Sequence, residues 1–312
     1  MASDYTYEIS YGKLQVPLYR VYARPLAGFA PIPESAFTRR ENTLFAVEID
    51  VEIFGDTFLA AYTEGDNSRV VATDSMKNVV LRQALAYDGA TLEGYLAHLG
   101  RYFLTTYADM QRLRLTGRQM PFEAAIVPGE NGFAASAALF SHQRGEHAVA
   151  TIEMDRDDHG NARLLGASSG LVGLQLLKVT GSAFTRFVRD ANTTLPDRGD
   201  RPLYIHMDVS WKYTNPDDLL ATDSPRYVPA EQVRDLLNAT FSAFVSESIQ
   251  HLVHEMGLRL LARFPQLAAL SFEAQNRTPD PMAVSETDDK LKVYSAAFPA
   301  FGLIRLTLRR SG

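Results

Sequence analysis

Two long stretches of the chain alternate strictly between apolar and polar residues. The stretch 43–55 places Phe45, Val47, Ile49, Val51 and Ile53 on one side. The stretch 204–213 does the same with Ile205, Met207, Val209, Trp211 and Tyr213. A period of two over such lengths is typical of antiparallel strands that have one face on a core and one polar face. The polar face need not meet bulk solvent, because it could line a channel.

Helical patterns follow the strand patterns in both halves of the chain. Residues 74–87 and 91–107 form one predicted pair, and a second helical region runs from about 229 to 264, where Pro265 ends it. The next ten residues, LAALSFEAQN, are predicted to form a strand. This order predicts an α+β fold of two similar units, each with helices packed on one face of an antiparallel sheet. We place the boundary near residues 140–150, although no repeat or Pro/Gly-rich linker marks it.

Length and composition exclude several kinds of site. A chain of 312 residues with 46% apolar residues can form two domains with substantial cores. No cysteine is present, so disulfides, thiolate metal ligands and cysteine nucleophiles are excluded. A net charge of −6 argues against a nucleic-acid partner. The first residues do not resemble a signal peptide and no apolar run could span a membrane, so we expect no membrane partner and a cytoplasmic location.

Two motif-like stretches are better interpreted as structural. QHLVHE places His251 and His254 three residues apart beside Glu255, but in neither of the established zinc-binding orders. GASSGLVG (166–173) is rich in glycine, but it leads into a predicted strand and not into the helix that a phosphate loop requires. The sequence patterns therefore predict no metal and no cofactor.

The stretch VVATDSMKN (70–78) has two interpretations. Thr73, Asp74 and Ser75 stand between an apolar segment and a predicted helix, so helix capping is the simpler explanation. A helix start also offers backbone N–H groups and positive potential to an anionic ligand. Both interpretations are compatible with these residues.

At this stretch the chain resembles the urate oxidase (uricase) family, and in particular its bacterial branch. The matching stretches are YGK (11–13), IPESAF (32–37), GDNSRVVATDSMKN (65–78), SGLVGLQLLKVTGSAFTRFVRDANTTLPD (169–197), RPLYIHMDVSWKY (201–213), SIQHL (248–252), RFPQL (263–267), FEAQNRT (272–278), KVY (292–294) and FGL (301–303). Each is weak alone, but their order and spacing over nearly the whole chain make the resemblance specific.

The resemblance implies two tandem tunnelling-fold (T-fold) domains, which we place at residues 1–145 and 146–312. Two chains would complete an antiparallel barrel with helices outside, and two such rings would stack into a homotetramer. Active sites would then lie at subunit interfaces. This agrees with the polar sheet faces, which would line the tunnel.

The resemblance also implies a binding site for a planar, anionic purine. Arg201 and Gln250 match the pair that clamps urate from two sides, which suits a guanidinium fork and an amide. Phe184 matches the aromatic residue on which the purine stacks. Ile249 would contribute a backbone N–H group, and Leu195 would form a wall of the pocket.

The remaining implied residues are catalytic. Thr73 and Asp74 match a pair that reaches the purine from the adjacent subunit. Lys13 matches the lysine that moves a proton through Thr73, and Asn276 matches the asparagine that, with Thr73, holds oxygen or water above the substrate. The implied reaction oxidises urate with O2 to 5-hydroxyisourate and hydrogen peroxide, without a metal or flavin.

One part of the motif departs from the family. Family members carry a histidine one or two residues after this asparagine, where the present chain has Arg277 and Thr278, and Pro279 replaces a tryptophan. The third member of the proton relay is therefore open: another histidine such as His251 could replace it in space, ordered water with Lys13 and Thr73 could suffice, and Arg277 could act on the lysine by charge repulsion. The order of residues 279–291 is also open. The C-terminal RRSG is not the SKL peroxisomal signal, which favours a cytoplasmic enzyme.

Two other functions compete with an active uricase. A catalytically weak purine-binding oligomer would keep Arg201, Gln250 and Phe184 without a working relay. A T-fold enzyme acting on pterins is the more remote alternative, because the Cys and His ligands of its zinc-dependent members are not found.

Overall fold

The computed structural model describes residues 5–130, 132–220, 225–296 and 299–311. Contacts divide the chain into two compact units, which are described separately. The first unit holds residues up to Ala30, Thr38–Ser169 and Asn215–Tyr227; the second holds Pro31–Phe37, Gly170–Thr214 and the chain from Val228 onward. No helix among the described residues is both long enough and apolar enough to cross a membrane.

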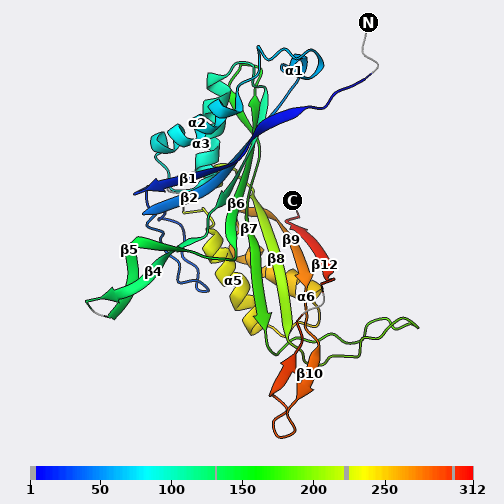
Figure 1. The fold of residues 1–312 in the computed structure, drawn as a ribbon. Helices are drawn as coiled ribbons and strands as arrows, with labels where there is room; N and C mark the ends of the chain where they lie inside the picture. Colours follow the sequence, from blue (N-terminus) through cyan, green and yellow to red (C-terminus); the bar gives the residue numbers. More distant parts are fainter. Residues whose placement is uncertain (1–4, 131, 221–224, 297–298, 312) are drawn as a thin grey trace. The chain divides into compact units, whose positions relative to one another are not determined.

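The first unit is an antiparallel sheet with helices packed on it (Figure 1). The strand order is β1-β2-β3-β6. Its elements are β1 (Ser10–Val21), β2 (Leu44–Phe54), α1 (Leu59–Thr63), α2 (Thr73–Ala86), α3 (Leu92–Thr106), β3 (Arg112–Gln119), β6 (His147–Arg156) and α4 (Asp217–Leu220). Strands β4 (Phe122–Gly129) and β5 (Gly132–His142) form a separate hairpin, and β7 (Ala162–Lys178) begins in this unit.

The second unit repeats the combination of sheet and helices. Its strands β8, β9 and β12 are antiparallel neighbours, and β7 ends in this unit. The elements are β8 (Leu203–Tyr213), α5 (Ala230–Ala243), α6 (Ile249–Arg263), β9 (Leu267–Asn276) and β12 (Gly302–Arg309). A small hairpin of β10 (Pro281–Val284) and β11 (Lys292–Tyr294) lies at the same end of these strands as the long loop after β7 (Figure 1).

The alternating side chains form the two cores as expected. The alternating apolar residues predicted to face the core in β2 and β8 are all buried, and α3 and α6 pack against the corresponding sheet faces. Each helix carries a glycine where it meets the sheet. A Cβ on Gly100 would lie 2.5 Å from the Met154 sulfur, and one on Gly257 would lie 2.1 Å from Leu308 Cδ1. Both helices therefore approach their sheets more closely than any other residue type would allow.

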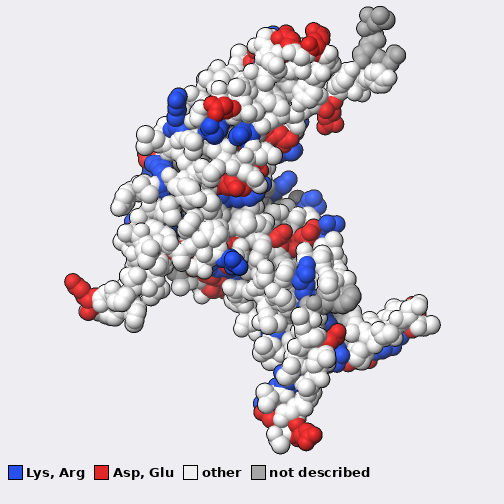
Figure 2. Space-filling view, viewed as in Figure 1, with Lys and Arg blue, Asp and Glu red and all other residues white. Residues whose placement is uncertain are grey.

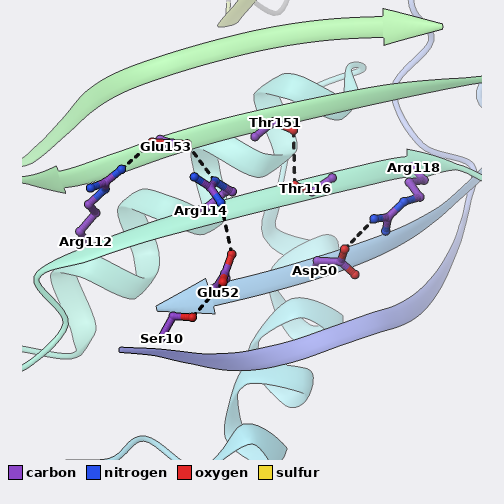
Figure 3. A network of polar contacts seen from close by, with 9 residues as sticks. All are labelled: Ser10, Asp50, Glu52, Arg112, Arg114, Thr116, Arg118, Thr151 and Glu153. Carbon is purple, nitrogen blue, oxygen red and sulfur yellow. Dashed lines mark hydrogen bonds and ion pairs between the residues drawn. The ribbon is translucent and has the colours of Figure 1, made fainter. Parts of the chain in front are cut away.

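The polar face of the first sheet carries rows of opposite charge (Figure 3). Strand β3 contributes arginines, whereas β2 and β6 on either side contribute carboxylates. Arg114 bonds Glu153 at 2.8 Å and lies 3.5 Å from Glu52, and Arg118 bonds Asp50 at 2.8 Å. We call these rows the charge ladder. Figure 2 likewise shows basic and acidic side chains intermixed on the face that it displays, so neither sign dominates there.

The predicted α+β class, the strands at 43–55 and 204–213 and the helices near 74–87 and 91–107 are confirmed. The second helical region resolves into α5 and α6, and LAALSFEAQN forms β9. Part of the open segment 279–291 forms β10 and its turn. The domain limits 1–145 and 146–312 stay a prediction.

The capping interpretation of Thr73, Asp74 and Ser75 is wrong. The N-cap residue of α2 is Ala72, which makes no side-chain capping bond. Asp74 instead accepts hydrogen bonds from Lys77 Nζ at 2.5 Å and Asn78 Nδ2 at 3.0 Å, one turn further along the helix. The polar residues begin one position too late to act as the cap.

Candidate active site

A cavity of about 360 Å³ lies in the second unit, at the end where β9 leads into the β10–β11 hairpin. Three of the predicted residues line it: Leu195, Arg201 and Asn276. Its walls also include Arg198, Thr278 and Lys292, which the sequence analysis did not assign to a site. The cavity therefore joins residues from three separate parts of the chain and is lined by several cations.

Backbone hydrogen bonds hold the loop after β7 in place beside this cavity. Phe184 and Arg198 exchange two backbone bonds, at 2.8 and 3.0 Å. The Arg201 N–H donates to the Ser182 carbonyl at 2.8 Å. The Asp200 carboxylate accepts from Thr180 Oγ1 and the Gly181 N–H, both at 2.7 Å. An otherwise irregular loop is thereby fixed, and its carboxylate is already engaged.

Arg201 is a partly buried cation whose charge is not balanced by a neighbouring carboxylate among the described residues. Its Nε atom is buried and has no hydrogen-bond partner in that part of the chain. Burial lowers the pKa of Arg201, and the positive charge of Arg198 lowers it further. A guanidinium keeps its charge under these conditions, so the arrangement favours an anion that can supply the missing acceptors.

Phe184 lies next to this guanidinium. The Arg201 Cζ atom is 5.3 Å from the centroid of the Phe184 ring. Phe187 stacks on Phe184 with centroids 4.9 Å apart and ring planes 9° apart. The aromatic ring is therefore backed by a second ring, and it is half-buried. Such a supported ring is suited to stacking with another planar group.

The start of α6 is linked to the same loop. The Ala183 N–H donates to the Ser246 carbonyl at 2.7 Å, and the Ser246 and Ser182 hydroxyl groups are 3.1 Å apart. Ser248 caps the helix by accepting the His251 N–H at 3.1 Å. Ile249 is buried in the first helical position.

Gln250 follows Ile249 on α6 with an exposed side chain. Neither residue lines the cavity, but the serine pair holds their segment beside the loop that contains Phe184. His251 is exposed, packs against Phe244 with ring centroids 4.6 Å apart and does not line the cavity either.

The YGK stretch lies on β1 of the first unit, and its three residues have different structural surroundings. Tyr11 accepts the Val71 N–H on its hydroxyl at 3.0 Å, and burial raises the pKa of Tyr11. A Cβ on Gly12 would lie 1.9 Å from the Val51 carbonyl oxygen, so only glycine fits. Lys13 follows as a half-buried side chain. The tyrosine thus ties the Lys13 strand to the segment that leads into α2.

Thr73 and Asp74 open α2 with exposed side chains. The first helical bond joins the Met76 N–H to the Ala72 carbonyl at 3.2 Å, so the backbone N–H groups of Thr73 and Asp74 precede the helical ladder. The Lys77 hydrogen bond and charge lower the pKa of the Asp74 carboxyl, and the charge of Lys13 contributes in the same direction. Lys13 and the start of α2 therefore belong to one electrostatic neighbourhood.

The predicted residues fall into two groups, one in each unit. Lys13, Thr73 and Asp74 form the group of the first unit. The group of the second unit contains Phe184, Leu195, Arg201, Ile249, Gln250 and Asn276. Their individual roles stay predictions. Thr278 was missed as a site residue, although its position two residues after Asn276 was a usable signal, because a threonine there can bond back to the asparagine side chain in a turn.

Comparison with known proteins places the chain in a family. The Uricase family model matches residues 48–153 and 167–305. The chain is 47% identical over 272 residues to a uricase of Haloferax volcanii, covering 86% of this chain and 88% of the relative. It is 43% identical over 303 residues to the uric acid degradation bifunctional protein PucL of Bacillus subtilis. That match covers 97% of the chain but only 61% of the bifunctional relative.

The fold agrees with a solved relative. The urate oxidase of Bacillus sp. TB-90 superposes with a TM-score of 0.95 at 39% identity, covering 97% of this chain and 100% of the other. The family model extends over both units, and its match includes every predicted site residue except Lys13, which precedes residue 48. The chain belongs to the uricase family.

Proposed function

We propose that this protein is a urate oxidase. It converts urate, O2 and water to 5-hydroxyisourate and hydrogen peroxide, in the degradation of purines and without a cofactor. Family membership and the names of the relatives support this activity. Within the chain, the observation that carries the proposal is Arg201, a cation without a carboxylate partner on a cavity beside a supported aromatic ring.

Urate binding follows from the group in the second unit. Urate is a planar anion, so its carbonyl and ring-nitrogen edge suits the Arg201 fork, and the Gln250 amide would meet it from the other side. Its ring would stack on the face of Phe184 that is turned away from Phe187. Leu195 would exclude water, and the Ile249 N–H at the start of α6 would donate to the ligand.

The group in the first unit would supply the proton chemistry. Lys13 would take a proton from urate through the Thr73 hydroxyl, and the Asp74 N–H would donate to the purine. The resulting dianion passes one electron to O2, the radical pair combines at C5 as a peroxide anion, and the proton held by Lys13 returns through Thr73 to give the hydroperoxide. Water then replaces the hydroperoxide at C5, and hydrogen peroxide leaves. Asn276, together with Thr73, would hold first oxygen and then water above the ring.

A homotetramer with interfacial active sites would unite the two groups. In this proposal Thr73 and Asp74 of one chain meet Arg201 and Gln250 of another. The outermost strands support it. Within the described residues, β1 pairs on one side with β2, and β12 pairs on one side with β9. Each leaves a free edge that a second chain could pair to extend the sheets into a barrel. The cytoplasmic location expected from the sequence remains part of the proposal.

The first test is oxygen uptake with urate in the presence of EDTA, followed together with the loss of urate absorbance. We expect equimolar consumption of O2 and urate. Lys13→Met should lower kcat by about 10²–10⁴-fold, because a general base is removed. The matched control is Lys212→Met, which removes an exposed lysine from β8.

Urate binding without oxygen uptake would contradict the proposal and favour the catalytically weak purine-binding protein. Full activity of the Lys13→Met variant would leave the enzyme assignment intact but refute the role of Lys13. Equal losses in both lysine variants would mean that the effect of Lys13→Met is not specific to the site.

A further inference from the structure

Two residues beyond β9 turn back on its last residue. Asn276 ends the strand, and its Oδ1 accepts a hydrogen bond from Thr278 Oγ1 at 2.5 Å and from the Thr278 N–H at 3.3 Å. Both residues line the cavity that contains Arg201. Thr278 therefore occupies the amide oxygen of Asn276 with two donors.

This arrangement fixes which end of the Asn276 amide is available. An asparagine side chain carries one acceptor oxygen and one donor nitrogen. Since Oδ1 is engaged, the available group is Nδ2, which has no hydrogen-bond partner among the described residues. Asn276 thus offers the cavity a hydrogen-bond donor and not an acceptor.

Arg277, which stands between the two, makes its side-chain contacts with other residues. Its guanidinium donates twice to Gln275 Oε1, at 3.0 and 2.8 Å, and lies 4.4 Å from the centroid of the Phe301 ring. The Arg277 guanidinium is therefore engaged by Gln275 and Phe301, and both hydrogen bonds from Thr278 to Asn276 form with an arginine between the two residues.

We propose that Thr278 is a positioning residue that orients the Asn276 amide toward the oxygen species of the reaction. This inference rests on the proposed urate oxidase function. Superoxide and hydroperoxide are anionic or strongly polarised acceptors, whereas O2 is a weak acceptor. A fixed N–H donor stabilises the former more than the latter, which lowers the barrier to oxygen reduction. A freely rotating amide would spend part of its time with its oxygen repelling the same species.

The test compares Thr278→Val with Thr278→Ser. Valine keeps the shape of threonine but lacks the hydroxyl, whereas serine keeps the hydroxyl. We expect Thr278→Val to lower kcat/KM for O2 by about 10- to 30-fold. The dissociation constant of xanthine, a planar purine without the 8-oxo group, should change by less than about threefold, because urate-side contacts are untouched. Thr278→Ser should restore kcat/KM for O2 to within about threefold of the wild type.

Thr287→Val is the matched control. Thr287 makes the same kind of contact, with its hydroxyl 3.2 Å from the Ser285 hydroxyl two residues earlier, but it does not line the cavity. It should leave both kcat/KM for O2 and the dissociation constant of xanthine unchanged. If the wild type is active and the Thr278→Val variant is equally active, the inference is overturned but the proposed function stands. The same holds if the Thr278→Ser variant is as slow as the Thr278→Val variant. A wild-type chain that consumes no O2 with urate would overturn both the inference and the proposed function.

Discussion

The starts of α3 and α6 have the same construction but different surroundings. Each helix has 15 residues and a hydroxyl cap that accepts the N–H three residues later: Thr91 from Gly94, and Ser248 from His251. Each has glycine at its ninth position, against the sheet. The second position differs: it is Glu93 in α3 and Gln250 in α6.

Glu93 is enclosed, whereas Gln250 is exposed. The Glu93 carboxyl accepts from Ser169 Oγ at 2.6 Å and Tyr227 OH at 3.1 Å, and burial raises its pKa. In the first unit, side chains of the same unit thus surround the second residue of the helix. In the second unit, the corresponding residue is exposed. The same helix start serves stability in one unit and, as we propose, substrate binding in the other.

The first strands of the two units show the complementary difference. In β1 the N–H of Gln15, at φ 55°, donates to Asp50 Oδ1 at 2.8 Å; in β7 the N–H of Gly173, at φ 78°, donates to Asp208 Oδ1 at 2.7 Å. Two residues before Gln15 lies Lys13, but two before Gly173 lies a leucine. Each unit therefore carries only part of the predicted chemistry, and in the proposed function residues of both kinds of unit, from different chains, would act together.

Among replacements at the two helix starts, that of Gln250 should give the largest effect on function. Gln250→Leu removes one side of the proposed clamp, so kcat/KM for urate should fall by about 10²–10³-fold, mainly through KM. The midpoint of thermal unfolding should not change, because the side chain is exposed. Steady-state kinetics and thermal unfolding of the same preparations would check both parts.

The matched control is Gln143→Leu, at another exposed glutamine, which should change neither quantity. If Gln250→Leu instead lowered stability and left kcat/KM unchanged, the two helix starts would play the same structural role. The contrast between them would then be lost.

Replacing Glu93 should act on stability and its pH dependence. Burial raises the folded-state pKa of Glu93 above its ordinary value of 4.5. The stability that this shift contributes is therefore present below pH 4.5 and lost as the pH rises through the raised pKa. Glutamine does not titrate, so Glu93→Gln should gain stability relative to the wild type as the pH rises, by about 1.4 kcal/mol per pH unit within that window.

Urea unfolding of both proteins between pH 4.5 and 8 would measure this difference, and urate turnover should be unaffected. A difference in stability that stays constant over the whole pH range would show that Glu93 is ionised in the folded chain. Reduced turnover would show that the start of α3 also takes part in the reaction.

The two caps should give the smallest effects. Thr91→Ala and Ser248→Ala each remove one side-chain cap, so each should lower the free energy of unfolding by about 1 kcal/mol. Only Ser248→Ala should also raise KM for urate, by a few fold, because it loosens the helix start that carries Gln250. Equal kinetic effects of the two variants would argue against a special role for α6.

The strands and helices could be predicted because the spacing of apolar residues within each segment indicates which of its side chains are buried. The alternation in 204–213 predicts which side chains enter the core, and Pro265, which predicted the end of a helix, lies two residues after the last residue of α6. The correspondence between the units could not be seen in the same way. It rests on a cap, a glycine and a positive-φ residue at matching places, and these few positions are too sparse to form a recognisable repeat.

The site was predictable in composition but not in geometry. Its residues were found by resemblance, since neither Arg201 nor Phe184 differs locally from an ordinary surface charge or core ring. The failed capping prediction had a physical cause: Asp74 has partners one helical turn away, which no N-terminal pattern reveals. Thr278 escaped notice because its importance comes from a contact with Asn276 and not from its own chemistry.

The charge ladder of the first sheet also restricts how this protein can change over time. Each arginine of β3 is matched with carboxylates on the neighbouring strands. Neutralising one member of a row would remove part of the counter-charge of a half-buried partner; Arg118 without Asp50, for example, would keep Glu48 at 3.4 Å. Substitutions there should therefore be accepted in compensating pairs, so among relatives the identities at Arg114 and Glu153, or at Arg118 and Asp50, should covary. The charge ladder would then be visible in an alignment as correlated substitutions, even where no single position is conserved.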